Sequence, residues 1–394
     1  MKILTYTTLF PNVEMPHHGI FVAERLRHLL ASGDVSAKVL APIPWFPSVN
    51  ERFGRYASYA RTPDIEFLEQ TEVLHPRYPV IPKVGMTVAP LLLALACRRV
   101  IRDQLDGLAD FDLIDAHYFF PDGVAAVLLG KWFRKPVVIT GRGTDLNLIP
   151  GYHAPRHMIK WAAERASGII TVSESLKSCL VDYDVPASKI RTLRNGVDLE
   201  LFRPLRDRNS VRRKFNVEGI CLLSVGHLIE RKGHHYIIQA LSFLPDDVGL
   251  VIAGEGPWRE KLRSLARSTG VENRVRFLGS RSHAELVEHY NAADALVLAS
   301  SREGMPNVIL ESLACGTPVV ATSVWGNPEI VAQEVAGELV SNQEPEAIAR
   351  AVQDLLARNE PRVNVRKYAE QFSWSATTAG QLDVFKSALQ SVVP

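Results

Sequence analysis

Short runs of β-branched and aliphatic residues alternate with helical patterns along nearly the whole chain, and this series begins a second time near its middle. Strands that alternate with helices form parallel sheets with helices on both faces. The sequence therefore predicts an α/β protein with two Rossmann-like, doubly wound domains that face each other across a cleft. The expected strands are 2–7, 37–41, 113–118, 137–140, 169–173 and 190–193 in the first domain, and 221–225, 249–253, 275–278, 295–299, 319–322 and 338–340 in the second.

A polar stretch without clear periodicity, residues 195–209, separates the two series. We place the first domain at 1–195 and the second at 196–371, and we expect a C-terminal helix at about 372–394 to pack back on the first domain. Residues 42–85 are rich in proline and arginine and are expected to form long loops. Ligands of such sheets bind beyond the carboxyl ends of the strands, so the loops that follow strands should hold the chemistry.

The composition excludes several classes of protein. Lysine and arginine number 45 against 43 for aspartate and glutamate, a net charge of +2, and this balance argues against a nucleic-acid partner. A hydrophobic content of 46% excludes intrinsic disorder. The amino terminus reads as a strand rather than a signal peptide. The cysteines form no C-x-x-C pair, which fits reduced thiols in a cytoplasmic protein and indicates no zinc site; they are Cys97, Cys179, Cys221 and Cys315.

One segment, Val84–Cys97, is apolar over its whole length and is followed by Arg98, Arg99 and Arg102. It is shorter than the roughly 20 residues needed to span a bilayer and contains Pro90, so no transmembrane helix is predicted. Two interpretations stay open. The segment is either a core helix or a helix that touches a membrane or the acceptor, which would place the protein at the inner face of the membrane.

The second half contains two carboxylates, Glu303 and Glu311, separated by seven residues. Glu303 follows the strand expected at 295–299, and Glu311 lies about one turn inside a helix that begins near Asn307. A carboxylate can accept hydrogen bonds from two adjacent hydroxyls of a sugar or ribose, and the first amides of the helix offer an anion site. By itself, a pair of glutamates at this spacing is an incidental feature of a helix, so whether it has a function depends on the motifs around it.

The neighbouring loops suggest a phosphate site. Residues 224–233, SVGHLIERKG, follow the first strand of the second domain, where Gly226 permits close backbone approach and Arg231 with Lys232 can neutralise a diphosphate. Alone, an Arg-Lys pair is usually a solvated loop tip. The segments AGEGP (253–257) and FLG (277–279) follow two further strands at the same edge, which makes a coincidence improbable.

The succession RKG, AGEGP, VRFLG, EGMPNVILESLACGTPVVAT and NPEIV resembles the family 4 retaining glycosyltransferases, which have the GT-B fold. The resemblance extends over nearly the full chain. It implies that Glu303 contacts the donor sugar and Glu311 the ribose, while Lys232 and Arg231 bind the diphosphate. The remaining donor-site residues implied by the resemblance are Gly226, the backbone at Phe277, and the segment Met305, Pro306 and Asn307. His227 stands where many members carry a second diphosphate-binding arginine; either Arg231 replaces it, or the site relies on Lys232 and backbone amides.

In the first half the resemblance covers three loops that follow strands. Gly19 matches the glycine that lets helix amides approach the donor phosphates, although it could be a simple helix-entry glycine. His117, in the segment DAHYFFPDG, matches a histidine that contacts the transferred sugar. Arg142 and Asp145 lie in a loop similar to the family's Gly-x-Asp loop and would fix acceptor or phosphate, unless Asp145 only stabilises the loop.

The resemblance implies a retaining sugar transfer from a nucleotide-diphosphate sugar to an acceptor, which we expect to be a lipid-linked or cell-surface polysaccharide precursor. A glycan or lipid-linked acceptor and the donor would be the partners, with no metal and no further cofactor. The two Asp-x-Asp strings, 110–112 and 182–184, do not follow strands in the way a metal site needs. A nucleotide-sugar epimerase of the same fold and a non-catalytic nucleotide-sugar-binding protein are the alternatives.

Overall fold

The computed structural model describes residues 1–81, 85–105 and 110–391. The chain forms two compact units, which are treated separately below. Unit 1 comprises Met1–Arg194 together with the C-terminal segment from Ser375, and unit 2 comprises Asn195–Trp374. Unit 1 therefore ends one residue earlier than the boundary placed from the sequence, and unit 2 extends to Trp374 rather than to residue 371.

The sheet of unit 1 has the order β10-β9-β8-β7-β1-β2-β5-β4, and all neighbours are parallel except β4 and β5. Strands β7 and β8 are buried along their whole length, as expected for a parallel sheet covered on both faces. A separate two-stranded sheet pairs β3 with β6. The strands are β1 (Lys2–Tyr6), β2 (Ser36–Leu40), β3 (Ile43–Pro44), β4 (Ile65–Leu68), β5 (Thr71–Leu74), β6 (Arg77–Tyr78), β7 (Leu113–His117), β8 (Val137–Gly141), β9 (Gly168–Thr171) and β10 (Ile190–Thr192).

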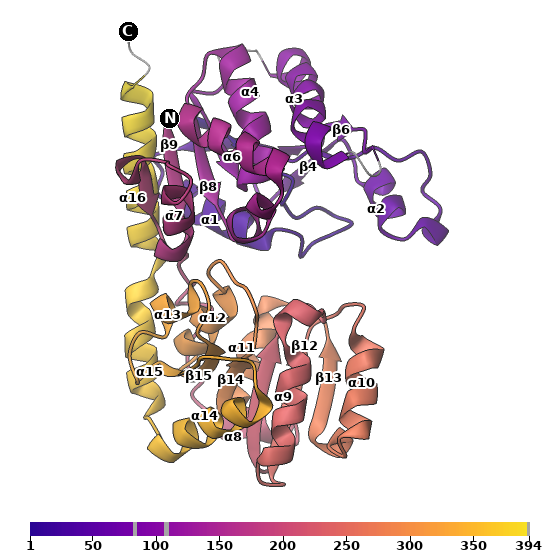
Figure 1. Ribbon diagram of the computed structural model, residues 1–394, viewed down its shortest axis with the longest axis vertical. Coiled ribbons are helices and arrows are strands. Elements are labelled where there is room, and N and C mark those ends of the chain that lie inside the picture. The colour runs from indigo at the N-terminus through magenta and orange to yellow at the C-terminus, as the bar shows by residue number, and fades with distance from the viewer. Residues whose placement is uncertain (82–84, 106–109, 392–394) are drawn as a thin grey trace. The chain divides into compact units, whose positions relative to one another are not determined.

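Helices of unit 1 lie beside this sheet, and α2 projects away from it (Figure 1). Leu26 and Leu29 of α1 pack in one apolar cluster with Leu382 and Phe385 of α16, so the C-terminal helix contributes to the core of this unit. The helices are α1 (Ile20–Leu30), α2 (Arg55–Arg61), α3 (Gly85–Gln104), α4 (Val124–Phe133), α5 (Thr144–Asn147), α6 (His153–Arg165), α7 (Glu174–Val181) and α16 (Trp374–Gln390).

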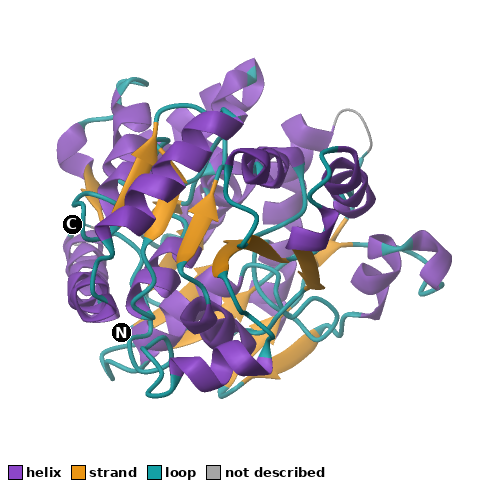
Figure 2. Ribbon diagram, turned by 90° about the horizontal axis from the view of Figure 1, so that it is seen from below, coloured by secondary structure: helices purple, strands orange, loops and turns teal. Residues whose placement is uncertain are grey.

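Unit 2 contains a parallel sheet with the order β13-β12-β11-β14-β15-β16. Figure 2 shows the strands of the chain in orange and its helices in purple. The strands of unit 2 are β11 (Ile220–Val225), β12 (Val248–Ala253), β13 (Val275–Gly279), β14 (Ala295–Leu298), β15 (Val319–Thr322) and β16 (Gly337–Val340). Its helices are α8 (Arg208–Lys214), α9 (His234–Ala240), α10 (Arg259–Ser268), α11 (His283–Ala292), α12 (Asn307–Ala314), α13 (Asn327–Ile330), α14 (Pro345–Arg358) and α15 (Arg362–Ala369).

The strands expected from the sequence are all present, with ends shifted by no more than two residues. The expectation of long loops over residues 42–85 was wrong in part, because this stretch contains β3 to β6 and α2. Its strands are two to four residues long and contain proline or charged and polar residues, so they lack the nearly continuous apolar runs of the buried parallel strands.

Helix α3 contains the apolar segment, and its burial bears on the first of the two interpretations, a core helix. Leu93, Cys97 and Ile101 are fully buried, so one face of the helix is core, whereas Leu91 and Leu95 are nearly half exposed. Val84, the first residue of the predicted segment, lies outside the described residues. Among the residues that the structure describes, no helix is long and apolar enough to cross a membrane.

Each sheet has one point at which the direction of strand succession reverses. In unit 1 it lies between β1 and β7, and in unit 2 between β11 and β14. Loops that leave the carboxyl ends of two such strands diverge and leave room for a ligand. These two points are where the sequence places most of its candidate residues.

Candidate functional site

In unit 2 the loops after β11 and β14 bring Lys232, Arg231 and Glu303 together. Lys232 Nζ donates to Glu303 Oε1 at 2.6 Å, and Arg231 NH1 lies 3.7 Å from Glu303 Oε2. Glu303 is 8% exposed. Burial alone would raise the pKa of Glu303, but the two cations outweigh burial and hold its pKa below the ordinary value. The group is therefore an ionised carboxylate with two cations beside it.

Two glycines shape the loop that carries Lys232. Gly233 has φ +70°, and a Cβ there would lie 1.9 Å from the carbonyl oxygen of Ala299, which precedes the Glu303 loop. Only glycine allows this approach, so Gly233 brings the two loops together. At Gly226 a Cβ would touch the methylene stem of Lys232 at 3.4 Å. Nδ1 of His227 lies 3.1 Å from the carbonyl oxygen of Glu255 in the neighbouring loop, whereas Arg231 lies beside Glu303.

Glu311 lies on the buried side of α12 and is oriented by two residues of α11. Tyr290 Oη donates to Glu311 Oε2 at 2.7 Å, and His283 Nε2 lies 3.9 Å from Oε1. Glu311 is 5% exposed and Tyr290 is fully buried. Neither Tyr290 nor His283 was found from the sequence, because no local pattern relates α11 to the following helix.

The orientation of Glu311 gives a direct prediction. We expect Tyr290→Phe to raise KM for the donor about tenfold with little change in kcat, because a lost hydrogen bond to a charged group costs roughly 1.5–3 kcal/mol and the ribose contact predicted for Glu311 would be made in the ground state and the transition state alike. Steady-state kinetics with varied donor measures this. Tyr368→Phe is the matched control, since Tyr368 donates to the carbonyl of Ile330 at 2.7 Å in the same unit. Equal KM values for the two variants would contradict the role of Tyr290.

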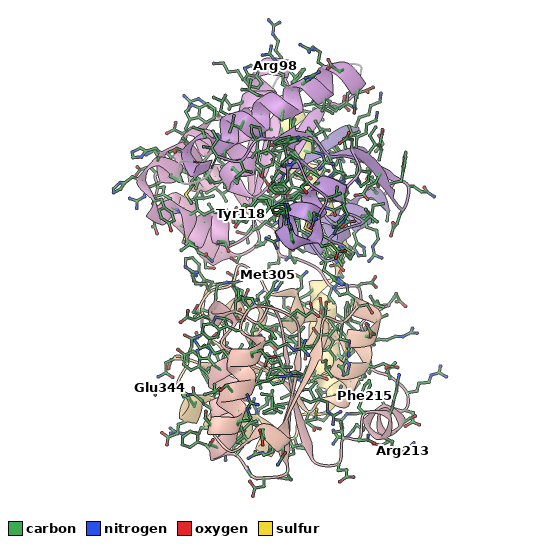
Figure 3. The ribbon with its side chains drawn as sticks, turned by 90° about the vertical axis from the view of Figure 1, so that its right-hand side faces the viewer. Arg98, Tyr118, Arg213, Phe215, Met305 and Glu344 are labelled. Carbon is green, nitrogen blue, oxygen red and sulfur yellow. The ribbon has the colours of Figure 1, made fainter. Side chains whose placement is uncertain are left out.

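The segment from Met305 to Asn307 leads from β14 into α12 (Figure 3 labels Met305). Asn195 holds this segment, since its backbone N–H faces Met305 Sδ at 3.2 Å and its side-chain amide donates to Asn307 Oδ1 at 2.9 Å. Pro306 is the N-cap, and among the described residues no side chain caps the helix, so its first amides are available to an anion. The ring of Phe277 packs against the core of unit 2, and the contact of its backbone with a ligand stays a prediction.

In unit 1, His117 ends β7 and both of its ring nitrogens are engaged. Nε2 lies 3.2 Å from Asp115 Oδ2, and Nδ1 lies 2.7 Å from NH2 of Arg142. Because a guanidinium only donates, Nδ1 accepts, and the proton is assigned to Nε2. Burial lowers the pKa of His117 to about 4 against the opposing effect of Asp115, with Arg142 lowering it further. His117 is thus a neutral, fixed ring at pH 7, and its contact with the transferred sugar stays a prediction.

The network around His117 reaches the C-terminal helix. Gln381 of α16 donates to Asp115 Oδ2 at 3.2 Å and accepts from Nε of Arg25 at 2.7 Å. Arg25, Asp115 and Gln381 are each 1% exposed. The sequence gave no sign of Gln381, which lies 266 residues from its partner Asp115.

Asp145 organises the loop after β8. Its Oδ1 accepts the backbone N–H groups of Arg142 at 3.1 Å and of Gly143 at 2.7 Å, and its Oδ2 accepts that of Phe119 at 2.7 Å. Burial raises the pKa of Asp145 although these bonds oppose the shift. The contacts describe a loop-stabilising side chain, and a contact with acceptor or phosphate stays a prediction.

Gly19 begins α1 with φ +67°, and a Cβ there would lie 2.2 Å from the backbone of Leu9. The turn against which it packs is held by Asp122, whose Oδ2 accepts from the backbone and hydroxyl of Thr8 at 2.8 and 2.9 Å. This packing requires a glycine irrespective of any phosphate. Among residues 1–81, 85–105 and 110–391, no three histidine, cysteine or acidic side chains are placed to hold a metal ion.

Comparisons with known proteins agree on one family. Residues 23–201 match the family described as Glycosyltransferase Family 4, and residues 206–372 match Glycosyl transferases group 1. The D-inositol 3-phosphate glycosyltransferase of Corynebacterium glutamicum is 31% identical over 306 residues, 71% of this chain and 73% of that protein.

Two solved structures share the fold over almost the full length. Sucrose-phosphate synthase from Thermosynechococcus elongatus has a TM-score of 0.79 at 20% identity and covers 99% of both chains. The HepE protein of Anabaena in complex with UDP-glucose has a TM-score of 0.75 at 19% identity, covering 98% of this chain and 100% of that one.

Proposed function

The chain belongs to the group 1, family 4 glycosyltransferases and has the GT-B fold, and from this premise we propose that it transfers a sugar with retention from a nucleotide-diphosphate sugar. The observation that carries the donor class is the grouping of Lys232 and Arg231 around Glu303 at the switch point of unit 2. The similar HepE structure, which holds UDP-glucose, supports the same class.

The charges of unit 2 support the following proposed roles. Lys232 and Arg231 neutralise the diphosphate, and the backbone at Gly226 and the first amides of α12 complete its surroundings. Glu303 accepts hydrogen bonds from sugar hydroxyls, and Glu311 accepts them from the ribose. The three charges of the Lys232, Arg231 and Glu303 group sum to +1, which suits a ligand carrying two negative charges.

Catalysis follows from where charge develops. The bond between the anomeric carbon and the diphosphate oxygen breaks, leaving negative charge on the phosphate and positive charge on the sugar ring. Fixed cations beside the departing phosphate stabilise that state more than the ground state. The acceptor hydroxyl bonds to the anomeric carbon from the same face, and its proton passes to a phosphate oxygen. His117 is neutral and engaged at both nitrogens, so it does not serve as the base.

We further propose that the acceptor is a lipid-linked or cell-surface polysaccharide precursor, reached at the cytoplasmic face of a membrane. The support is α3, on which Leu91, Leu95, Arg98 and Arg102 follow at spacings of four, three and four residues along one exposed face. Figure 3 shows Arg98 at the periphery of unit 1. Exposed leucines beside arginines, without a long apolar span, are typical of a helix that lies on an anionic lipid surface.

This surface can be tested with vesicles containing phosphatidylglycerol. We expect Arg98→Glu/Arg102→Glu to lower vesicle affinity by about 30-fold, because each basic residue near an anionic surface contributes about 1 kcal/mol. The matched control is Arg263→Glu/Arg267→Glu on α10, which makes the same charge change on an exposed helix of unit 2. Equal affinity of both double variants for the vesicles would contradict the assignment of α3.

The transferase itself is tested by following donor consumption with a panel of UDP and GDP sugars. We expect consumption to depend on added acceptor, with retained anomeric configuration by NMR and an unchanged rate in the presence of a metal chelator. An epimerase would interconvert the donor without an acceptor, and a binding protein would bind a donor without consuming it under any acceptor. Either result would contradict the proposal.

A further inference from the structure

An aromatic surface on unit 1 has no part in the functions assigned so far. It is formed by residues 45–56, which follow β3, and it exposes large rings: Trp45 is 58% exposed and Tyr56 51%. Phe46 contacts the rings of Phe53 and Tyr56 at centroid distances of 5.2 Å and lines the same cavity as Trp45. In Figure 1, α2 projects from the sheet of this unit and carries Tyr56 with it.

The aromatic surface borders a cavity of about 410 Å³ that also contains polar groups. Its lining includes Trp45, Phe46, Thr62, Asp64 and Arg77. All three guanidinium nitrogens of Arg77 are engaged, since Nε donates to Asp64 Oδ1 at 3.1 Å and the two remaining nitrogens donate to the carbonyls of Tyr59 and Thr62. The side chain of Asp64 is 78% exposed, so its carboxylate can accept further hydrogen bonds from a ligand.

The backbone holds this cavity in place next to the loop that ends at Gly19. Trp45 donates its N–H to the carbonyl of Tyr78 at 2.8 Å, which continues the pairing of β3 with β6. Arg61 at the end of α2 pairs with Glu14 at 2.6 Å, and the N–H of Val13 donates to Glu66 Oε2 at 3.1 Å. The aromatic surface is therefore attached to the loop between β1 and α1, at the carboxyl-end edge of the sheet.

The charge around this surface differs from that of α3. Residues 42–81 contain five acidic residues against four arginines, and Asp64 pairs with Arg77, whereas residues 85–104 contain three arginines against one aspartate. Aromatic rings beside an exposed carboxylate fit a sugar: the C–H face of a pyranose packs on the electron-rich ring face, and its hydroxyls donate to the carboxylate.

We propose that Trp45, Tyr56 and Asp64 form a binding site for the glycan part of the acceptor, with a neutral sugar ring stacked on the aromatic rings and its hydroxyls on Asp64. This assignment rests on the proposed transferase function, for which it names the acceptor class.

The test uses the full-length protein with neutral trisaccharides of glucose, galactose, mannose and N-acetylglucosamine as probes, and saturation-transfer NMR with titration as the readout. We expect at least one trisaccharide to bind, Trp45→Ala and Tyr56→Ala to weaken its Kd at least tenfold, and Trp45→Phe to recover most of that loss. Asp64→Asn should weaken the same trisaccharide about threefold or more. The control is Phe243→Ala, which removes a ring that is 49% exposed on unit 2 and should leave the Kd unchanged.

The binding of UDP and GDP separates this proposal from the donor assignment. We expect Trp45→Ala to bind the nucleoside diphosphate with the affinity of wild type. If wild type binds neither UDP nor GDP, that result contradicts the proposed function independently of the glycan site. The glycan site is overturned if no trisaccharide binds, if Trp45→Ala binds it unchanged, or if Trp45→Ala instead loses affinity for phosphatidylglycerol vesicles.

Discussion

Lys232→Ala should lower kcat/KM for sugar transfer by about 100- to 1000-fold, the loss found when one fixed donor to a developing negative charge is removed from an active site. Lys232 is the nearest cation to Glu303, at 2.6 Å, and it follows β11 at the switch point of unit 2. Most of the loss should fall on kcat, because the charge on the diphosphate grows as the sugar–phosphate bond breaks.

The chain offers a matched control for this variant. Lys214 also pairs with a glutamate at 2.6 Å, Glu288, but lies on α8 with its side chain 58% exposed. Lys214→Ala removes the same positive charge and an ion pair of the same length. Because an exposed ion pair contributes little, this variant should keep kcat/KM within a factor of two of the wild-type value. Similar values of kcat/KM for Lys232→Ala and Lys214→Ala would contradict the placement of Lys232 in the catalytic site.

Glu303→Gln should lower kcat/KM for the nucleotide sugar by about 10- to 100-fold, because a hydrogen bond to a charged group contributes roughly 1.5–3 kcal/mol. Glutamine keeps the size of the side chain but removes the charge that the sugar hydroxyls and Lys232 both use. The affinity for the nucleoside diphosphate alone should stay equal or rise, because an anion beside the diphosphate has been neutralised.

A loss for the nucleotide sugar without a loss of affinity for the nucleoside diphosphate distinguishes a sugar-binding carboxylate from a merely structural one. A structural role would weaken UDP or GDP and the corresponding nucleotide sugar by the same factor. Titration calorimetry with both ligands measures the difference, and Glu288→Gln serves as the control on the exposed ion pair of α8 and α11.

The succession of strands along the chain and the edge that carries the site could be predicted from the sequence, because parallel strands buried on both faces are nearly continuous apolar runs. Lys232 and Glu303 lie 71 residues apart, yet they meet because β11 and β14 are neighbours in the sheet. The sequence placed both at carboxyl ends of strands, and the family resemblance assigned them to one ligand.

Other parts of the site depend on contacts that no local pattern encodes. Gln381 reaches Asp115 only because α16 packs on the sheet of unit 1, and Tyr290 meets Glu311 only through the packing of α11 on α12. Likewise β4 is defined by its antiparallel pairing with β5 rather than by its own composition, since most of its residues are exposed. Tertiary contacts, rather than the β-propensity of the residues themselves, determine whether such a strand forms.

The central claim is that the cations of unit 2 recognise a diphosphate, and a comparison of nucleoside with nucleoside diphosphate tests it most directly. Calorimetric Kd values would be measured for uridine, UDP, guanosine and GDP with wild type and Lys232→Ala. The account predicts that the variant loses at least tenfold in affinity for the diphosphate that wild type binds and keeps the affinity for its nucleoside. Equal diphosphate affinity in the two proteins, or an equal loss for nucleoside and diphosphate, would contradict it.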